Sequence, residues 1–155
     1  MNAARSFLSF VCFVNFVSFA PPGAAAQQPS PVVQVYKTPT CGCCGKWVKH
    51  LQANGFTVRA TDLDSTGPVQ TRHGVPTEVR SCHTAIVNGY VVEGHVPAAE
   101  VKRLVKERPK IAGIAVAGMP VGSPGMEMPG TEPHPYYVVS FDRNGRIEVF
   151  AKYGR

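Results

Sequence analysis

The residues of this sequence with the most distinctive chemistry are its cysteines. Cys41, Cys43 and Cys44 form the run CGCC, and Cys82 stands alone further along the chain. Cys41 and Cys44 have the CxxC spacing that is typical of redox-active dithiols and of metal sites. Both uses depend on the thiolate, which is the nucleophile in disulfide exchange and the form of cysteine that binds metal ions. The spacing alone leaves both uses open.

Cys43 favours metal binding over redox chemistry. A dithiol oxidoreductase needs two cysteines, and a third adjacent thiol offers unwanted disulfide partners. A soft-metal site gains from each additional sulfur, and thiolate and thioether ligands favour Cu(I). We therefore expect Cys41, Cys43, Cys44 and Cys82 to bind copper. Three alternatives stay open: an oxidoreductase in which Cys41 and Cys44 are catalytic and metal binding is incidental, a passive copper chaperone, and a protein held by structural disulfides.

Zinc is the competing ion, because four thiolates also suit a tetrahedral structural site. Such sites usually combine two CxxC pairs, and this chain has one, so zinc is the weaker candidate. His83 follows Cys82 and offers a further ligand. Side chains of neighbouring residues in a regular strand point to opposite faces. Cys82 and His83 can therefore share one site only where the backbone is irregular.

Three methionines support copper. Met119, Met126 and Met128 lie in GMPVGSPGMEM, a segment rich in Gly and Pro. Methionine often fills gaps under loops, and that interpretation stays open. Thioethers next to thiols nevertheless form a donor set suited to Cu(I).

The other histidines differ in how strongly the sequence indicates them as metal ligands. His95 follows Glu93 at strand spacing, so we expect the two side chains to face the same way, and whether His95 is a ligand stays open. His50 lies off the apolar stripe of its predicted helix and is expected to be solvated. His73 and His134 occur in turn-like contexts and receive no role.

The pattern of apolar and turn residues predicts the elements that position these side chains. We expect a helix that begins within the cysteine cluster, with Thr40 as N-cap, and ends at Asn54-Gly55. A second helix is expected over 97–108. Segments 64–76 and 111–135 are expected to be turns and an ordered loop. The predicted strands are 32–36, 56–63, 83–87, 90–93, 136–141 and 146–153.

This order predicts an α/β fold that looks thioredoxin-like, with a small mixed sheet, flanking helices and a C-terminal β-hairpin. By that analogy the segment after Pro76 enters the sheet antiparallel to the first strand. The start of the third strand would then lie beside the cysteine cluster. We therefore expect all four cysteines at one end of the sheet.

The first 26 residues resemble a secretory signal peptide. A single charge at Arg5 precedes an apolar run of about 14 residues and the small residues Ala24 to Ala26. That run is shorter than the roughly 20 residues that span a bilayer. We expect residues 1–26 to be removed and residues 27–155 to form one metal-binding domain in the periplasm, with no membrane contact.

The basic residues near Lys102 and Arg108 are interpreted as the solvated face and end of a helix, so no nucleic-acid partner is expected.

Three blocks of the sequence closely resemble an exported bacterial family of copper-resistance proteins called CopG, first catalogued as a domain of unknown function. The blocks are YKTPTCGCCGKWVKHLQANGF, GVPTEVRSCHTAIVNGYVVEGHVPA and GMPVGSPGME, and the resemblance runs from about Val33 to Tyr153. It implies a thioredoxin-like domain that binds copper and has a redox role in periplasmic copper handling, with other copper-handling proteins as its partners. The ligands that it implies are Cys41, Cys43, Cys44 and Cys82 first, and His83, Met119 and Met126 next.

Overall fold

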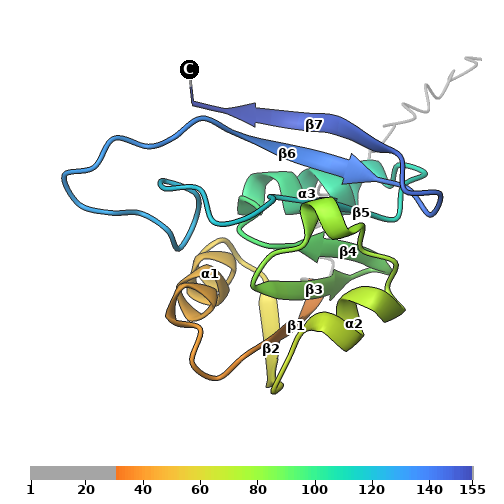
Figure 1. The fold of residues 1–155 in the computed structure, drawn as a ribbon, viewed down its shortest axis with the longest axis horizontal. Helices are drawn as coiled ribbons and strands as arrows, with labels where there is room; N and C mark the ends of the chain where they lie inside the picture. The colour runs from red at the N-terminus through yellow and green to blue at the C-terminus, as the bar shows by residue number, and fades with distance from the viewer. Residues whose placement is uncertain (1–30, 155) are drawn as a thin grey trace, which may run out of the picture.

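Seven strands form one mixed sheet in the computed structural model, which describes residues 31–154 (Figure 1). The predicted signal peptide lies outside the described residues. The strands are β1 (Val32–Lys37), β2 (Thr57–Asp62), β3 (His83–Val87), β4 (Tyr90–Glu93), β5 (Gly113–Ala115), β6 (Tyr136–Phe141) and β7 (Ile147–Tyr153). The helices are α1 (Gly42–Ala53), α2 (Gly67–Arg72) and α3 (Ala98–Glu107), with a short 3-10 turn η1 (Thr77–Val79). The α/β class is confirmed, while the thioredoxin-like assignment stays a prediction.

The order of the strands is β2-β1-β3-β4-β5-β6-β7. Two pairs are parallel, β1 with β2 and β4 with β5, and each is joined by a crossover helix, α1 and α3 respectively. The remaining neighbours are antiparallel. β5 pairs with both β4 and β6, so the C-terminal hairpin extends the same sheet instead of forming a separate unit.

The core lies on both faces of this sheet because inward side chains alternate along each strand. On one face Ala85, Val92 and Ile114 pack with Trp47 of α1 and Leu104 of α3. The opposite face carries a smaller cluster formed by Val75, Val79, Val91, Ala115 and Phe141. Along α1 the stripe Cys44, Trp47 and Leu51 is buried, as its helical spacing predicts.

Three local predictions are wrong. Helix α1 has Cys41 as its N-cap, not Thr40. The 64–76 segment contains α2, a helix of six residues that begins with Gly-Pro and is too short to show an apolar stripe. The 111–135 segment contains β5, whose three residues are held as a strand by neighbours on both sides.

His50 is half-buried and not solvated as expected. Its Nε2 accepts a hydrogen bond of 3.0 Å from the backbone N–H of Ala98, the first residue of α3. Pro97, the N-cap of α3, supplies no capping side chain, so the imidazole from α1 provides the missing acceptor. Burial lowers the pKa of His50, which favours the neutral ring that this bond requires.

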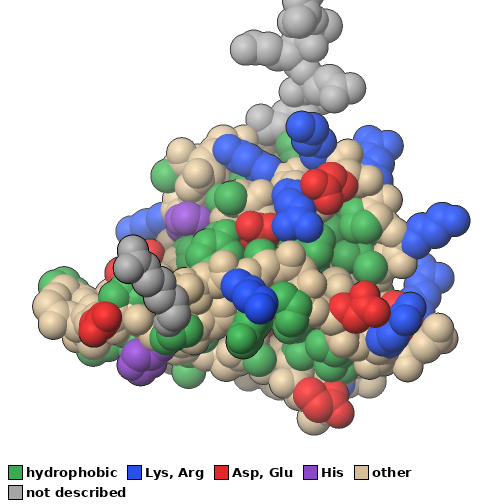
Figure 2. Space-filling view, turned by 90° about the horizontal axis from the view of Figure 1, so that it is seen from above, with side chains coloured by type: hydrophobic (Ala, Val, Ile, Leu, Met, Phe, Trp, Pro, Cys, Tyr) green, Lys and Arg blue, Asp and Glu red, His purple; other side chains and the backbone are tan. Residues whose placement is uncertain are grey.

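The hairpin of β6 and β7 forms an exposed face on which hydrophobic side chains lie between Lys and Arg side chains (Figure 2). Tyr137, Ile147 and Val149 are among its exposed apolar residues. Within residues 31–154 no helix combines the length and apolar character needed to cross a membrane.

Candidate metal centre

Cys41, Cys43 and Cys44 occupy the start of α1, directly after the turn that follows β1. Cys41 is the N-cap and Cys44 is buried. The first amides of a helix lack acceptors within the helix, and with the helix dipole they favour negative charge. This position therefore stabilises the thiolate form of the cysteines when they are reduced.

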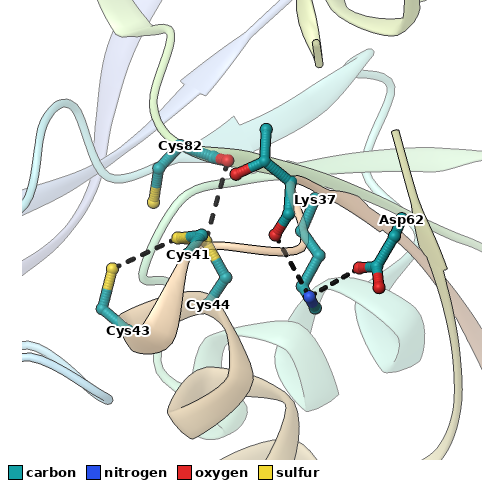
Figure 3. Close-up of polar contacts among 7 residues, drawn as sticks. Lys37, Cys41, Cys43, Cys44, Asp62 and Cys82 are labelled. Atoms are coloured by element: carbon teal, nitrogen blue, oxygen red, sulfur yellow. Dashed lines mark hydrogen bonds and ion pairs between the residues drawn. A yellow bond between two sulfur atoms is a disulfide. The ribbon is translucent and has the colours of Figure 1, made fainter. Parts of the chain in front are cut away.

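Cys41 and Cys44 are joined by a disulfide, while Cys43 and Cys82 are free thiols (Figure 3). Cys43 Sγ lies 3.4 Å from Cys41 Sγ. The CxxC pair is thus in its oxidised form, with a third thiol in contact with it.

Cys82 reaches the cluster from the neighbouring strand. β1 and β3 are antiparallel with Lys37 opposite His83, which places the start of β3 beside the end of β1. The Sγ atoms of Cys41, Cys43, Cys44 and Cys82 all lie within 4.8 Å of one another. The expectation that the four cysteines gather at one end of the sheet is confirmed.

Cys82 also contacts two histidines. Its Sγ lies 3.4 Å from His83 Nδ1 and 3.3 Å from His95 Nε2. β3 begins at His83, so Cys82 lies in the bend before the strand, and the pleat does not force the two side chains apart. The irregular backbone that a shared site requires is therefore present.

His95 is the residue of this centre that the sequence left undecided. β4 ends at Glu93 and Gly94 turns the chain with φ +70°, so the strand-spacing argument for His95 does not apply. His95 Nδ1 lies 2.9 Å from the carbonyl oxygen of Pro124. A carbonyl can only accept, so Nδ1 carries the proton and Nε2 presents a lone pair to Cys82. A hydrogen bond to the ring nitrogen that faces away from the metal commonly fixes the tautomer of a metal-binding histidine.

Burial sets the charge of both histidines. Desolvation, followed by the proximity of His95, lowers the pKa of His83 to about 3, and desolvation also lowers the pKa of His95. The rings are neutral at neutral pH and keep lone pairs for a metal ion. Among the described residues His83 Nε2 has no hydrogen-bond partner, and its ring packs against Trp47 at 4.4 Å between centroids. Burial, and next the nearby Cys43, raise the pKa of the Cys82 thiol.

One of the three methionines contacts the cluster. Met119 Sδ lies 4.0 Å from Cys43 Sγ, and the Met119 side chain is 52% exposed. Met126 is half-buried and Met128 is exposed. Among residues 31–154 the polar contacts of the cysteine sulfurs include Met119 but neither of the other two.

The loop that carries these methionines packs tightly on the start of α1. Gly125 has φ +87°, and a Cβ at this position would lie 2.8 Å from the carbonyl oxygen of Cys43 and 2.9 Å from the backbone nitrogen of Trp47. Only glycine allows this approach without a shift of the backbone. The close contact brings Pro124 to His95 and holds the loop against the cysteine cluster.

A buried carboxylate supports the Cys82 side of the centre. Glu93 is fully buried and accepts three hydrogen bonds of 2.7 Å, from Ser81 N–H, Gln70 Nε2 and Thr84 Oγ1. Ser81 in turn donates through its Oγ to the carbonyl oxygen of Gly118, at 2.7 Å. Glu93 thus connects the bend that presents Cys82 with the loop that presents Met119. The sequence predicts no such role for Glu93, because its three partners come from three different segments: α2, the bend before β3, and β3.

An ion pair between Lys37 and Asp62 lies beside the turn that leads into the cysteine cluster. Lys37 Nζ donates to Asp62 Oδ1 at 2.6 Å and to the carbonyl oxygen of Thr38 at 3.2 Å (Figure 3). It joins the ends of β1 and β2 just before the turn that leads into Cys41. The pair fixes the strand end from which the cluster starts.

This arrangement defines an α/β protein with a sulfur-rich donor set, completed by neutral imidazoles and a thioether, at one end of its sheet. Such a set matches soft metal ions.

Comparison with known proteins gives the family. Two solved structures described as copper resistance protein copG, form 2 and form 1, are each 46% identical to this chain, with a TM-score of 0.76. The alignments cover 81% and 83% of this chain and 99% and 100% of the two structures. The family described as a protein of unknown function, DUF411, matches residues 79–126. None of the curated protein sequences compared with the chain matches it. The chain belongs to the CopG family of copper resistance proteins.

Proposed function

We propose that this protein binds copper as Cu(I) at the cysteine cluster and serves copper tolerance in the periplasm. One observation carries the proposal: four cysteine sulfurs from two distant segments lie within 4.8 Å of one another. Any single disulfide uses only two of them. A soft ion explains why all four converge, and the similar structures are described as copper resistance proteins.

The contacts suggest how the ligands divide. Cys41, Cys43, Cys44 and Cys82 supply thiolates, and Cys82 also belongs to a second group of donors with His83 and His95, again within 4.8 Å. Because Cys82 is common to both groups, its sulfur is placed to bridge two ions. Met119 lies at the exposed side next to Cys43. Met126 stays in the proposed set on the resemblance alone.

The disulfide determines when copper can bind. With Cys41 and Cys44 oxidised, Cys43 and Cys82 are the two members of the cluster that remain as thiols. Opening the disulfide takes two electrons and two protons, which an external dithiol can supply while it is itself oxidised to a disulfide. The proposed copper-binding form is therefore the fully reduced one.

Anaerobic titration of the reduced protein (residues 27–155) with Cu(I), against a competing chromogenic chelator, tests copper binding. We expect Cys43→Ser and Cys82→Ser each to weaken binding at least tenfold. His95→Gln should weaken it less, and His73→Gln, at a histidine outside the site, should have no effect. Wild-type affinity no higher than that of a simple dithiol peptide, or an unchanged Cys43→Ser, would refute the proposal. A parallel titration with Zn²⁺ distinguishes the competing ion.

Export is part of the proposal and has its own test. Fractionation of cells that express the full chain should place the protein in the periplasm, shortened by its first 26 residues. A product that keeps these residues in the cytoplasm would contradict the proposed location. Other periplasmic copper-handling proteins are the partners expected there.

A thiol–disulfide oxidoreductase is the second candidate, and the Cys41–Cys44 disulfide at a helix start favours it. Its test is the reduction potential of the pair in the absence of copper. A value between about −120 and −270 mV, with turnover on disulfide substrates that persists in Cys43→Ser, would support this candidate over copper binding.

A further inference from the structure

A basic hollow lies at the end of the sheet opposite the cysteines. The turn Asn88-Gly89 between β3 and β4 forms part of it, as do the segment just before β5, the turn after β6 and the ends of α2 and α3. β3 begins at His83, in the candidate metal centre, and ends at Val87, next to the hollow. The length of the strand therefore separates the hollow from the candidate metal centre. Its volume is about 850 Å³, within the roughly 300–1,000 Å³ of small-molecule sites.

Three arginines from three separate elements line the hollow. Arg72 ends α2, Arg108 is the C-cap of α3, and Arg143 lies in the turn between β6 and β7. His73 is also among the lining residues, and none of them is acidic.

These arginines lack counter-charges within residues 31–154. The ion pairs found there use Lys37, Arg103 and Arg146, and none involves the three arginines of the hollow. The two acids next to these arginines in sequence, Glu107 and Asp142, are engaged elsewhere. Glu107 pairs with Arg103 at 3.3 Å, and Asp142 Oδ1 accepts from the amides of Asn144 and Arg146. Three like charges around one concave surface create a positive potential that only an external anion can neutralise.

The backbone at Arg108 is a second, independent observation. Its φ of 49° and ψ of 51° are left-handed, a conformation that usually falls to glycine at a helix C-terminus. A side chain at this position strains the backbone, yet arginine occupies it and lines the hollow. Strain of this kind is found where a side chain has a use.

The remaining surface of the hollow is partly apolar. Val91 is buried, and Ile111 and Ala112 are half-buried. Tyr90 is fixed by a hydrogen bond from its hydroxyl to the carbonyl oxygen of Pro109, at 2.9 Å. Guanidinium groups bind carboxylates and phosphates through paired hydrogen bonds, and an apolar surface between them suits a carbon skeleton. We propose that this hollow binds a small organic polyanion that carries carboxylate or phosphate groups.

The test is a titration of the ¹⁵N-labelled protein (residues 27–155), followed by NMR at constant ionic strength. The probes are citrate for carboxylates and inorganic pyrophosphate for phosphates, with chloride as the reference anion. We expect saturable shifts at the amides of Gly74, Gly89, Ala112 and Arg143, and none at the cysteine end. Binding of only one probe supports the proposal and identifies the chemical class. Shifts that do not saturate, or that spread over all basic surfaces, would overturn it.

Arg108→Gly separates binding from folding. Glycine accepts the left-handed backbone without strain, so this variant should unfold at the same or a higher temperature while its affinity for the probe falls at least tenfold. Arg59→Gly removes an equal charge from exposed strand β2, which β1 separates from β3 and which contributes no residue to the lining of the hollow. The folding of this variant is checked separately, and its affinity should not change. Equal losses in the two variants would show that the anion responds only to net charge, and the proposal would fail.

Discussion

Replacing Glu93 by Gln should remove a large pH dependence from the stability of the metal-free protein. Burial is the leading cause that raises the pKa of Glu93 from 4.5 to about 7, against its hydrogen bonds and the charge of Arg80. Between these two pH values the folded protein keeps a proton that the unfolded chain has lost. The free energy of unfolding therefore falls as the pH rises, because the unfolded state binds fewer protons. The stability that the proton on Glu93 contributes is complete below pH 4.5 and is lost by the time the pH passes about 7.

The size of the effect follows from the shift. A change from 4.5 to about 7 corresponds to about 3 kcal/mol, at 1.36 kcal/mol for each unit of pKa. Glutamine keeps the three contacts of Glu93. Its oxygen accepts from Ser81 N–H and Gln70 Nε2, and its amide donates to Thr84 Oγ1. The variant should fold normally but should not take up the proton.

Urea unfolding of both proteins from pH 4.5 to 8, followed by circular dichroism, measures this difference. The stability of Glu93→Gln relative to wild type should rise by about 3 kcal/mol over this range. His83 and His95 titrate in the opposite sense, since their lowered pKa values cost stability as the pH falls, but both proteins contain them and their effect cancels. Glu148→Gln, at an exposed position, controls for the lost charge. A difference between Glu93→Gln and wild type that stays constant with pH would refute the reasoning.

Three further predictions concern the metal centre and the helix next to it. Met119→Leu should weaken Cu(I) binding by several-fold and Met128→Leu should not, because Met119 contacts a cysteine sulfur and Met128 has no such contact among the described residues. Equal effects of the two variants in the chelator competition would contradict this. Trp47 is the only tryptophan of the sequence, and it packs against His83. Cu(I) should therefore quench the Trp47 fluorescence with the same stoichiometry as it binds. Unchanged emission at saturation would count against His83 as a ligand. His50→Ala should lower the free energy of unfolding by about 1–3 kcal/mol, since it leaves the Ala98 amide at the start of α3 without its acceptor. An unchanged urea midpoint would show that water replaces the imidazole as the acceptor.

The longer elements of the fold were predictable because each carries a local signal. The stripe of Cys44, Trp47 and Leu51 defines α1, and the turn pair Asn88-Gly89 defines the hairpin of β3 and β4. α2 and β5 were missed for a shared reason. Both are too short to show a period, and β5 is a strand only because β4 and β6 supply hydrogen bonds on its two sides.

The sequence by itself determined which chemistry this protein offers. The CGCC run, Cys82, His83 and the methionines are visible as residue types, and their softness as ligands does not depend on the fold. The antiparallel entry of β3 was also predicted, by the analogy of the element order with a thioredoxin-like fold.

Only the tertiary structure decided which donors meet. His95 joins Cys82 because Gly94 turns the chain after β4 and Pro124 fixes the tautomer of the ring. Glu93 matters because residues from three separate segments converge on it. Such contacts depend on the close approach of backbones far apart in sequence, and no local pattern records them.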